Sequence, residues 1–348
     1  MKEDWKECKL GEVLTIKYGK NQKEVESPNG TIPIYGTGGL MGYATKFLYD
    51  KPSILIGRKG TINKVKFIDK PFWTVDTLFY SIINEEIVSP KFLYYQLSLI
   101  NFMNYNEGTT IPSLRTETLN RIEVSLPPLA TQQKIATILS SLDDKIELNN
   151  KINDNLEQQA QAIFKNWFVD FEPFGGKMPE GWKVGKLSDL ITIKYGKDHK
   201  KLDDGKHPVY GSGGIMRYVD KFLYDKESVL IPRKGTLNNV FYINEPFWSV
   251  DTMFYTEMKK ENIAKYVYFF VKGKDLNSMN AGSAVPSMTT EILNAIEVVI
   301  PSDEYLEKFE NIVSPMFKQI KQCIIENENL ASIRDTLLQK LMNGEIEV

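Results

Sequence analysis

The sequence has little cysteine, no long apolar run and no secretory signal, and each absence excludes a class of protein. Two cysteines, Cys8 and Cys323, are too few for a disulfide framework and fit a reducing cytoplasm. The longest apolar runs have the length of a strand, as at 53–57, and a membrane span needs roughly 20 residues. No apolar segment follows the charged residues after Met1. We therefore expect a cytoplasmic protein that makes no contact with a membrane.

An excess of charge of one sign is also missing, because 43 Lys and Arg face 45 Asp and Glu, for a net charge of −2. The 348 residues are 42% hydrophobic and 11% aromatic, which is enough for ordinary cores. At roughly 150 residues per domain, this length suggests about two domains. Disordered and collagen-like chains are excluded.

A long internal repeat organises the chain. A shift of 175 aligns residues 33–80 with 208–255 at 31 of 48 identical positions, which chance does not produce. Short β-branched and aromatic runs between Gly, Pro, Asn and Asp predict strands and tight turns in each copy, as at 53–56 and 65–68, and 91–103 has a helical pattern. We predict an α+β protein with two mixed α/β domains at 1–127 and 177–301.

Each copy is followed by a long segment nearly free of Gly and Pro, at 130–168 and 303–342. The spacing of apolar positions alternates between four and three over about four heptads, which is typical of a coiled-coil seam. We expect a spacer helix and linker over 128–176 and a second spacer helix over 302–348. The two helices should pair antiparallel, so that the molecule has approximate two-fold symmetry. An ordinary amphipathic packing helix is the alternative. The expected pairing residues are Leu139, Leu142, Ile146, Asn153, Leu156, Ile163, Val313, Met316, Ile320, Asn327, Leu330 and Leu337.

Two polar or helix-breaking residues qualify this prediction. A shift of 174 places Asn153 opposite Asn327, and a polar residue in the seam commonly fixes the register of a coiled coil. Pro315 lacks an N–H group and should start or kink the second helix.

The net charge hides an uneven distribution. It is +2 over 1–127, −3 over 128–176, +3 over 177–301 and −4 over 302–348. Both repeat copies are mildly basic and both helices acidic, which alone is weak evidence for nucleic acid.

A repeated turn has stronger chemistry for DNA. The motif Arg58-Lys59-Gly60-Thr61-x-Asn63 recurs at 233–238. In DNA recognition an Arg side chain can bridge the O6 and N7 atoms of guanine, an Asn side chain can bind the adenine edge, and a Lys side chain can bind a phosphate. A solvated surface turn is the alternative. A glycine-rich turn, a tryptophan and an Asp-Thr pair also recur, with core or turn roles as alternatives. The DNA-binding candidates are Tyr35, Gly36, Gly38, Gly39, Arg58, Lys59, Thr61, Asn63, Trp73, Asp76, Thr77 and Thr109, and in the second copy Tyr210, Gly211, Gly213, Gly214, Arg233, Lys234, Thr236, Asn238, Trp248, Asp251, Thr252 and Ser283.

Catalysis and metal binding find little support. Asp251 with Glu257 and Lys259 resembles a nuclease set, but the first copy lacks the Glu and the Lys. His199 and His207 lie in one polar loop without a Cys or His cluster around them. We expect no catalytic residue and no metal ligand in this chain.

In these motifs the chain resembles the specificity subunit of type I restriction-modification enzymes over nearly its whole length. The resemblance rests on the two-copy plan, the glycine-rich turn at 35–39, the stretch 108–114, the exits at 126–129 and 166–173, the opening at 179–182 and the ending at 337–345. It implies that each copy is a target recognition domain reading half of a split DNA site. The helices would then be spacers that dock methyltransferase subunits.

The resemblance also implies where the chemistry lies. S-adenosylmethionine would belong to the methyltransferase partner, and ATP and magnesium to a separate restriction and translocase subunit, with no cofactor on this chain. Because the two copies are alike, we predict an inverted-repeat target. The alternative is a protein-interaction module on a coiled-coil spacer with no role in DNA recognition.

Overall fold

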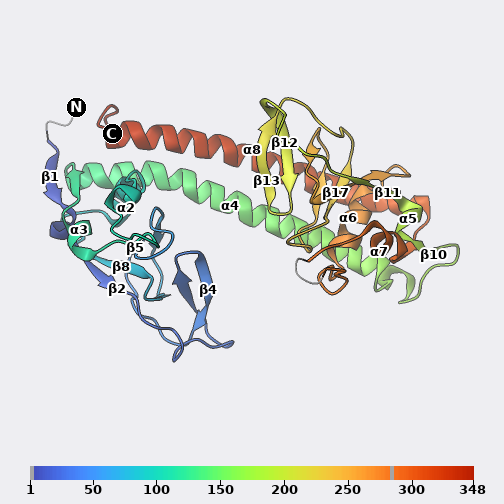
Figure 1. Cartoon of the computed structure of the whole chain (residues 1–348), viewed down its shortest axis with the longest axis horizontal. Helices are drawn as coiled ribbons and strands as arrows, with labels where there is room; N and C mark the ends of the chain where they lie inside the picture. Colours follow the sequence, from blue (N-terminus) through green and yellow to red (C-terminus); the bar gives the residue numbers. More distant parts are fainter. Residues whose placement is uncertain (1–3, 283–285) are drawn as a thin grey trace. The chain divides into compact units, whose positions relative to one another are not determined.

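The computed structural model describes residues 4–282 and 286–348, which form two compact units. The first unit consists of Met1–Asn149 with Ile325–Val348, and the second of Asn150–Ile324. Two long helices, α4 (Leu129–Phe168) and α8 (Asp303–Met342), each contribute one half to each unit (Figure 1). The candidate Ser283 lies outside the described residues.

Among the described residues, the globular part of the first unit contains three sheets. A two-stranded sheet pairs β1 (Lys6–Lys9) with β9 (Glu123–Leu126). A four-stranded sheet has the order β2 (Leu14–Tyr18), β8 (Leu78–Ile83), β5 (Ser53–Gly57) and β6 (Val65–Ile68). A three-stranded sheet has the order β4 (Gly39–Ala44), β3 (Ile32–Gly36) and β7 (Trp73–Thr74). Short helices α1 (Leu10–Val13), α2 (Pro90–Ser98) and α3 (Thr116–Asn120) and the 3-10 helix η1 (Phe102–Tyr105) complete it.

The second unit repeats this plan. A two-stranded sheet pairs β10 (Lys183–Lys186) with β18 (Glu297–Ile300). A four-stranded sheet has the order β11 (Ile191–Tyr195), β17 (Met253–Met258), β14 (Ser228–Pro232) and β15 (Phe241–Ile243). A three-stranded sheet has the order β13 (Gly214–Val219), β12 (Asp204–Gly211) and β16 (Trp248–Ser249). Its helices are η2 (Glu172–Phe174), α5 (Leu187–Leu190), α6 (Ala264–Lys272) and α7 (Thr290–Ala295). The predicted pair of mixed α/β domains is therefore confirmed in outline, while the predicted bounds stay a prediction.

The central strands form where the sequence is most apolar. Every residue of β5 is buried, and its neighbour β8 carries a buried serine opposite it. The Ser53 hydroxyl donates to the Ser81 carbonyl oxygen at 2.7 Å, and the Ile54 amide donates to the Ser81 hydroxyl at 2.8 Å. Ser228 and Thr256 make the same bonds in the second unit. These bonds satisfy polar groups that would be costly to bury alone.

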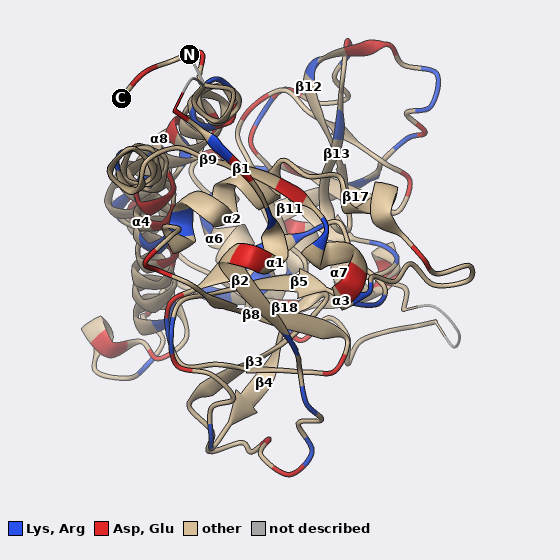
Figure 2. Cartoon of the chain, turned by 90° about the vertical axis from the view of Figure 1, so that its left-hand side faces the viewer, with Lys and Arg blue, Asp and Glu red and all other residues tan. Residues whose placement is uncertain are grey.

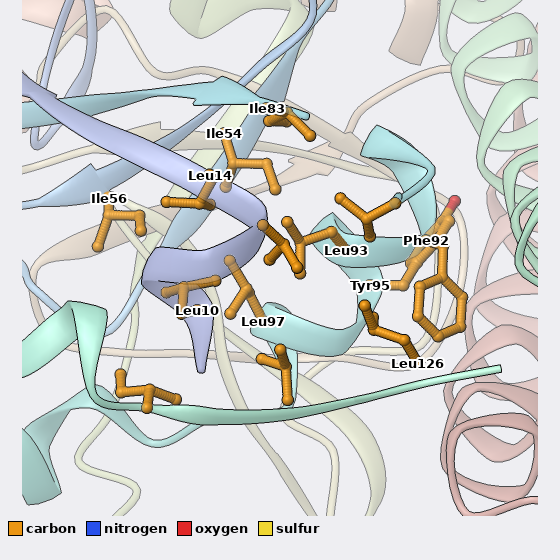
Figure 3. Close-up of a cluster of buried hydrophobic side chains, with 14 of the residues drawn as sticks. Leu10, Leu14, Ile54, Ile56, Ile83, Phe92, Leu93, Tyr95, Leu97 and Leu126 are labelled. Carbon is orange, nitrogen blue, oxygen red and sulfur yellow. The ribbon is translucent and has the colours of Figure 1, made fainter. Parts of the chain in front are cut away.

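The core of the first unit is built from both its globular part and the helix ends. Figure 3 shows buried side chains such as Leu10, Ile54 and Phe92 gathered between the sheet and α2. Leu139 of α4 and Leu341 of α8 belong to the same cluster, as do Ile135, Ala136, Leu338 and Met342. The long helices thus help to complete the core of the unit.

The second unit uses aromatic side chains at the corresponding place. Phe164 and Phe168 of α4 pack against Phe309 of α8 with ring centroids 6.2 and 5.2 Å apart. Ala160, Leu306 and Val313 join them in the core.

The helical predictions agree closely with the structure, with two corrections. The helix expected over 91–103 ends at Ser98, and the Asn101 side chain accepts from the Met103 amide to start the separate helix η1. Pro315 does not start the second long helix, because α8 already begins at Asp303 and continues through Pro315. Where α8 begins, the Tyr305 and Leu306 amides donate to the Ser302 carbonyl oxygen. Asp303 and Glu304 lie in the first turn, where the positive end of the helix dipole stabilises their negative charge.

Polar side chains join α4 and α8 within the first unit. Arg334 donates to Asp143 at 2.7 Å, and Asp143 also accepts from the Tyr95 hydroxyl of α2 at 2.6 Å. The buried Asn149 amide donates to Asn327 at 2.9 Å. Asn149 is therefore one partner of Asn327, and the pairing of Asn153 with Asn327 stays a prediction.

The expected pairing residues all lie away from solvent at least in part. Leu139 and Val313 are fully buried, and the other ten are half-buried. No helix among residues 4–282 and 286–348 combines the length and the apolar character needed to cross a membrane.

Candidate nucleic-acid interface

Three segments of the first copy meet around the repeated Arg-Lys turn. The amides of Arg58 and Lys59 donate to the Thr77 carbonyl oxygen at 2.8 and 3.2 Å, which joins the turn to the Asp76-Thr77 pair. The Gly60 amide donates to the Pro112 carbonyl oxygen at 2.9 Å, and the Leu114 amide donates to that of Arg58 at 2.9 Å. Segments 58–63, 76–77 and 108–114, which are distant in sequence, therefore form one surface.

The second copy builds the same surface. The Arg233 and Lys234 amides donate to the Thr252 carbonyl oxygen at 2.8 and 3.2 Å. The Gly235 amide donates to the Pro286 carbonyl oxygen at 3.2 Å, and the Met288 amide donates to the Arg233 carbonyl oxygen at 2.8 Å. The repeated sequence motifs thus correspond to a repeated geometry.

The arginine side chains are held in the same way in both copies. The Nη1 of Arg58 donates to the Asp76 carbonyl oxygen at 2.8 Å, and its guanidinium lies 5.2 Å from the centre of the Tyr18 ring. In the second copy the Nη1 of Arg233 donates to the Asp251 carbonyl oxygen at 3.1 Å, and its guanidinium lies 5.4 Å from the centre of the Tyr195 ring. Each half-buried guanidinium keeps further N–H groups for a partner.

The glycine-rich turn lies at the tip of the hairpin formed by β3 and β4. Gly39 has a φ of 120°, which disfavours other residues, and a Cβ at Gly38 or Gly39 would meet no atom within 4 Å. A backbone without side chains at an open tip permits close approach by a ligand. Gly213 and Gly214 have the same open surroundings. Gly36 and Gly211 are different, because a Cβ there would clash with the sulfur of Met41 or Met216.

The repeated tyrosine beside the hairpin tip differs between the copies. Lys66 lies 4.1 Å from the centre of the half-buried Tyr35 ring, and burial raises the pKa of Tyr35. Tyr210 is only 7% exposed and packs edge-on against Phe247. Burial also raises the pKa of Tyr210. Tyr210 therefore serves the core more than the surface.

The candidate asparagines and tryptophans hold the loops in place. The side-chain oxygen of Asn63 accepts from the Phe102 amide at 2.7 Å, and that of Asn238 from the Asn277 amide at 3.1 Å. The indole N–H of Trp73 donates to the Lys20 carbonyl oxygen, and that of Trp248 to Lys197, both at 2.9 Å. A base contact by these polar groups would need these bonds to be shared or exchanged.

The remaining candidates are accessible. In the first copy Lys59, Thr61, Asp76 and Thr109 are exposed and Thr77 is half-buried. The matching Lys234, Thr236 and Asp251 are exposed, and Thr252 is half-buried. These side chains are the polar groups that the surface offers to a ligand.

Sequence reasoning missed two pairs of residues at this surface. Tyr18 and Tyr195 lie in a repeated Thr-Ile-Lys-Tyr-Gly-Lys stretch, so the repeat itself is the signal that singles them out. The Asn106 side-chain oxygen accepts from the Gly108 and Ser113 amides at 2.9 and 2.8 Å. Asn280 makes the same bonds in the second copy. Both asparagines fall just before the repeated stretch at 108–114.

The residues considered for catalysis are dispersed. Glu257 pairs with Lys194 at 3.6 Å, and Lys259 donates to the Ser188 carbonyl oxygen at 2.6 Å. The His207 ring packs against Phe222. Within residues 4–282 and 286–348, no group of three His, Cys, Asp or Glu side chains is arranged to hold a metal ion.

Basic and acidic segments are interspersed along the loops that Figure 2 shows. Binding to nucleic acid at this surface would therefore depend on a few placed cations rather than on a general positive field.

Comparison with known proteins identifies relatives over most of the chain. A family described as the type I restriction modification DNA specificity domain matches residues 2–158 and again residues 179–334. The MjaIX specificity subunit of Methanocaldococcus jannaschii, from a type I restriction enzyme, is 27% identical over 346 residues, which cover 86% of this chain and 79% of that protein. The HindI specificity subunit of Haemophilus influenzae, also from a type I restriction enzyme, is 26% identical over 369 residues, which cover 76% of this chain and 79% of that protein.

A solved structure shares the fold. The type I restriction-modification S subunit from M. genitalium matches with a TM-score of 0.64 at 23% sequence identity, and the match covers 97% of this chain and 96% of that one. Both copies and both long helices therefore have counterparts in a known architecture.

Proposed function

The chain belongs to the type I restriction modification DNA specificity family, and from that premise we propose that each of its two copies reads one half of a bipartite DNA target. It is the non-catalytic specificity component of a restriction-modification complex. Family membership favours this function over a protein-interaction module with no DNA role.

One observation carries the finer proposal, namely the equal geometry of the two Arg-Lys turns. Arg58 and Arg233 have the same backbone partners and the same side-chain partners, within a few tenths of an ångström. Similar reading groups select similar bases, so we infer that the two half-sites are alike. The arginines contact base edges in this proposal, and Lys59 and Lys234 contact phosphates.

We further propose that α4 and α8 pair as an antiparallel coiled coil, which makes the target an inverted repeat. The contacts within each unit support this pairing. In the first unit Asp143 meets Arg334 and Asn149 meets Asn327, so residue numbers fall along one helix as they rise along the other. In the second unit Phe164 meets Phe309 and Trp167 meets Tyr305, in the same sense. A nonspecific spacer, whose bases this chain does not read, would lie between the half-sites.

The helical spacer is the proposed docking site for the methyltransferase subunits, and a restriction and translocase subunit completes the complex. Membership of the family implies assembly with other subunits. The net charges of −3 over 128–176 and −4 over 302–348 fit partner surfaces better than they fit DNA. S-adenosylmethionine belongs to the methyltransferase in this proposal, and ATP and magnesium to the nuclease. We place the complex in the cytoplasm with the chromosome it protects.

Methylome sequencing tests the proposal directly. A host that expresses this chain with its methyltransferase subunits should carry adenine methylation at two related half-sites in inverted orientation, with unspecified bases between them. A host without this chain but with the methyltransferase is the control and should lack that pattern. Two unrelated half-sites, or half-sites in direct repeat, would overturn the inference from the repeat.

A further inference from the structure

The tyrosines Tyr18 and Tyr195 stand out because they are half-exposed aromatic side chains at the same place in both copies. Tyr18 is 51% exposed and Tyr195 52% exposed, at the ends of strands β2 and β11. Each ring packs edge-on against one buried phenylalanine, Phe79 or Phe254, with centroids 5.1 Å apart. Each ring is thus held by a core residue while about half of the side chain stays exposed to solvent.

The arginine of the reading turn lies over each of these rings. The guanidinium of Arg58 is 5.2 Å from the Tyr18 centroid, and that of Arg233 is 5.4 Å from the Tyr195 centroid. A cation at this distance from an aromatic ring is attracted by the negative face of the ring. The hydrogen bond from Nη1 to the carbonyl oxygen of Asp76 or Asp251 fixes the guanidinium from a second direction.

This arrangement is the same in both copies although the backbone beside it is not. Gly57 precedes Arg58, and the corresponding residue before Arg233 is Pro232. A Cβ on Gly57 would lie 2.2 Å from the Thr61 carbonyl oxygen, so the two turns cannot have identical backbones at this point. The tyrosine, the arginine and the carbonyl oxygen keep their arrangement across that difference.

We propose that Tyr18 and Tyr195 are positioning residues that hold the reading arginines ready for a base, and so set the specificity of each half-site. This proposal rests on the proposed function, in which Arg58 and Arg233 read bases. A free arginine side chain must give up its rotational freedom when it binds a base. An arginine already confined between a ring and a carbonyl oxygen loses less, and it presents its remaining N–H groups in one direction.

The test uses the full chain assembled with its methyltransferase subunits and the target found by methylome sequencing. Affinity is measured for that target and for DNA with one base changed in one half-site. Tyr18→Ala should weaken binding to the target by about two- to fivefold, the range of an exposed cation–aromatic contact. It should also lower the preference for the target over the changed DNA. Tyr18→Phe keeps the ring and should restore both.

A double variant separates positioning from a structural role. With Arg58→Ala already present, adding Tyr18→Ala should cause no further loss, because the tyrosine acts through the arginine. Loss of the ring contact with Phe79 should lower the melting temperature equally with and without Arg58→Ala, so that stability and positioning are measured separately. Tyr195→Ala provides the matched test in the second copy, and the two single variants should relax opposite halves of methylated sites.

Two outcomes would overturn the proposal in distinguishable ways. If Arg58→Ala weakens binding but Tyr18→Ala does not, or if their losses add, the tyrosine does not position the arginine and the proposed function stands. If neither Arg58→Ala nor Arg233→Ala changes affinity or preference, the proposed reading by arginine fails, and the positioning role fails with it.

Discussion

Arg58 and Lys59 are neighbours in the chain but have different surroundings. Arg58 is half-buried, bound to the Asp76 carbonyl oxygen and stacked near Tyr18, while Lys59 is exposed. A confined guanidinium suits a base edge, and a flexible ammonium suits a phosphate. The two side chains should therefore contribute differently to binding.

This difference gives a prediction at the residue scale. Arg58→Ala should cost about 1 to 3 kcal/mol of binding free energy and relax the choice of bases at one half-site. Lys59→Ala should weaken binding about equally for all sequences and reduce the slope of log affinity against log salt by about 1. Titrations at several salt concentrations, with target and changed DNA, measure both. Equal effects of the two substitutions on base choice would contradict the assignment.

A second residue-scale prediction concerns the loop that supports the turn. Asn106→Ala removes the side chain that accepts from the Gly108 and Ser113 amides. We expect a loss of about 1 kcal/mol in the free energy of unfolding, because the freed amides regain water at this exposed loop. Denaturant unfolding measures it, with the nearby exposed Asn104→Ala as a control. If both variants unfold alike, the Asn106 bonds do not stabilise the loop.

At the scale of elements, a polar network adds to the apolar packing of α2 against the long helices in the first unit. Asp143 of α4 accepts from both Tyr95 of α2 and Arg334 of α8. Asp143→Ala should lower the free energy of unfolding by about 1 to 3 kcal/mol, since two partners lose their acceptor. Urea unfolding measures the change, and the exposed neighbour Asp144→Ala is the matched control. A loss no larger than that of the control would show that this network contributes nothing to stability.

The same network predicts a pH dependence. Burial, and after it the bond to Asp143, raises the pKa of Tyr95 above its ordinary value of 10.0. The unfolded tyrosine ionises first as the pH rises, so the contribution to stability is complete below pH 10.0 and is lost above it. Tyr95→Phe should therefore reduce the fall in stability between about pH 8 and about pH 11. Unfolding curves at these pH values that fall in parallel for both proteins would contradict the prediction.

The sequence predicts elements well where one local pattern dominates. The spacing by four and three predicted both long helices to within one residue at their ends, and short apolar runs predicted β5 and β6. The helix at 91–103 was predicted too long, because a side-chain cap at Asn101 is a local hydrogen bond that periodicity does not register. Pro315 continues α8 because helix contacts outweigh one missing hydrogen bond.

The candidate site was less predictable than the elements. The repeat identified the Arg-Lys turns, but Tyr18 and Arg58 are forty positions apart in the chain and meet only through folding. Asn63 and Trp73 have the residue types of base-contacting groups, and their hydrogen bonds to distant backbone atoms emerge only in three dimensions. Residue type and repetition indicate which positions matter, while packing decides what each one does.

At the scale of the whole molecule, weak positive charge on each copy predicts weak binding by the chain alone. Net charges of +2 over 1–127 and +3 over 177–301 sit within a chain of net charge −2. We expect the isolated chain to bind its target much more weakly than the complex with methyltransferase subunits at the same salt concentration. Equal affinities in a binding titration would mean that this chain supplies all the phosphate contacts itself.

The presence of α8 side chains in the core of the first unit has a consequence for synthesis. Leu338, Leu341 and Met342 pack with residues at positions up to 139, and the ribosome adds them about two hundred positions after those partners. The core of the first unit therefore stays incomplete until α8 has been synthesised. A chain truncated within the last two turns of α8 would carry its damage in the unit that is synthesised earlier.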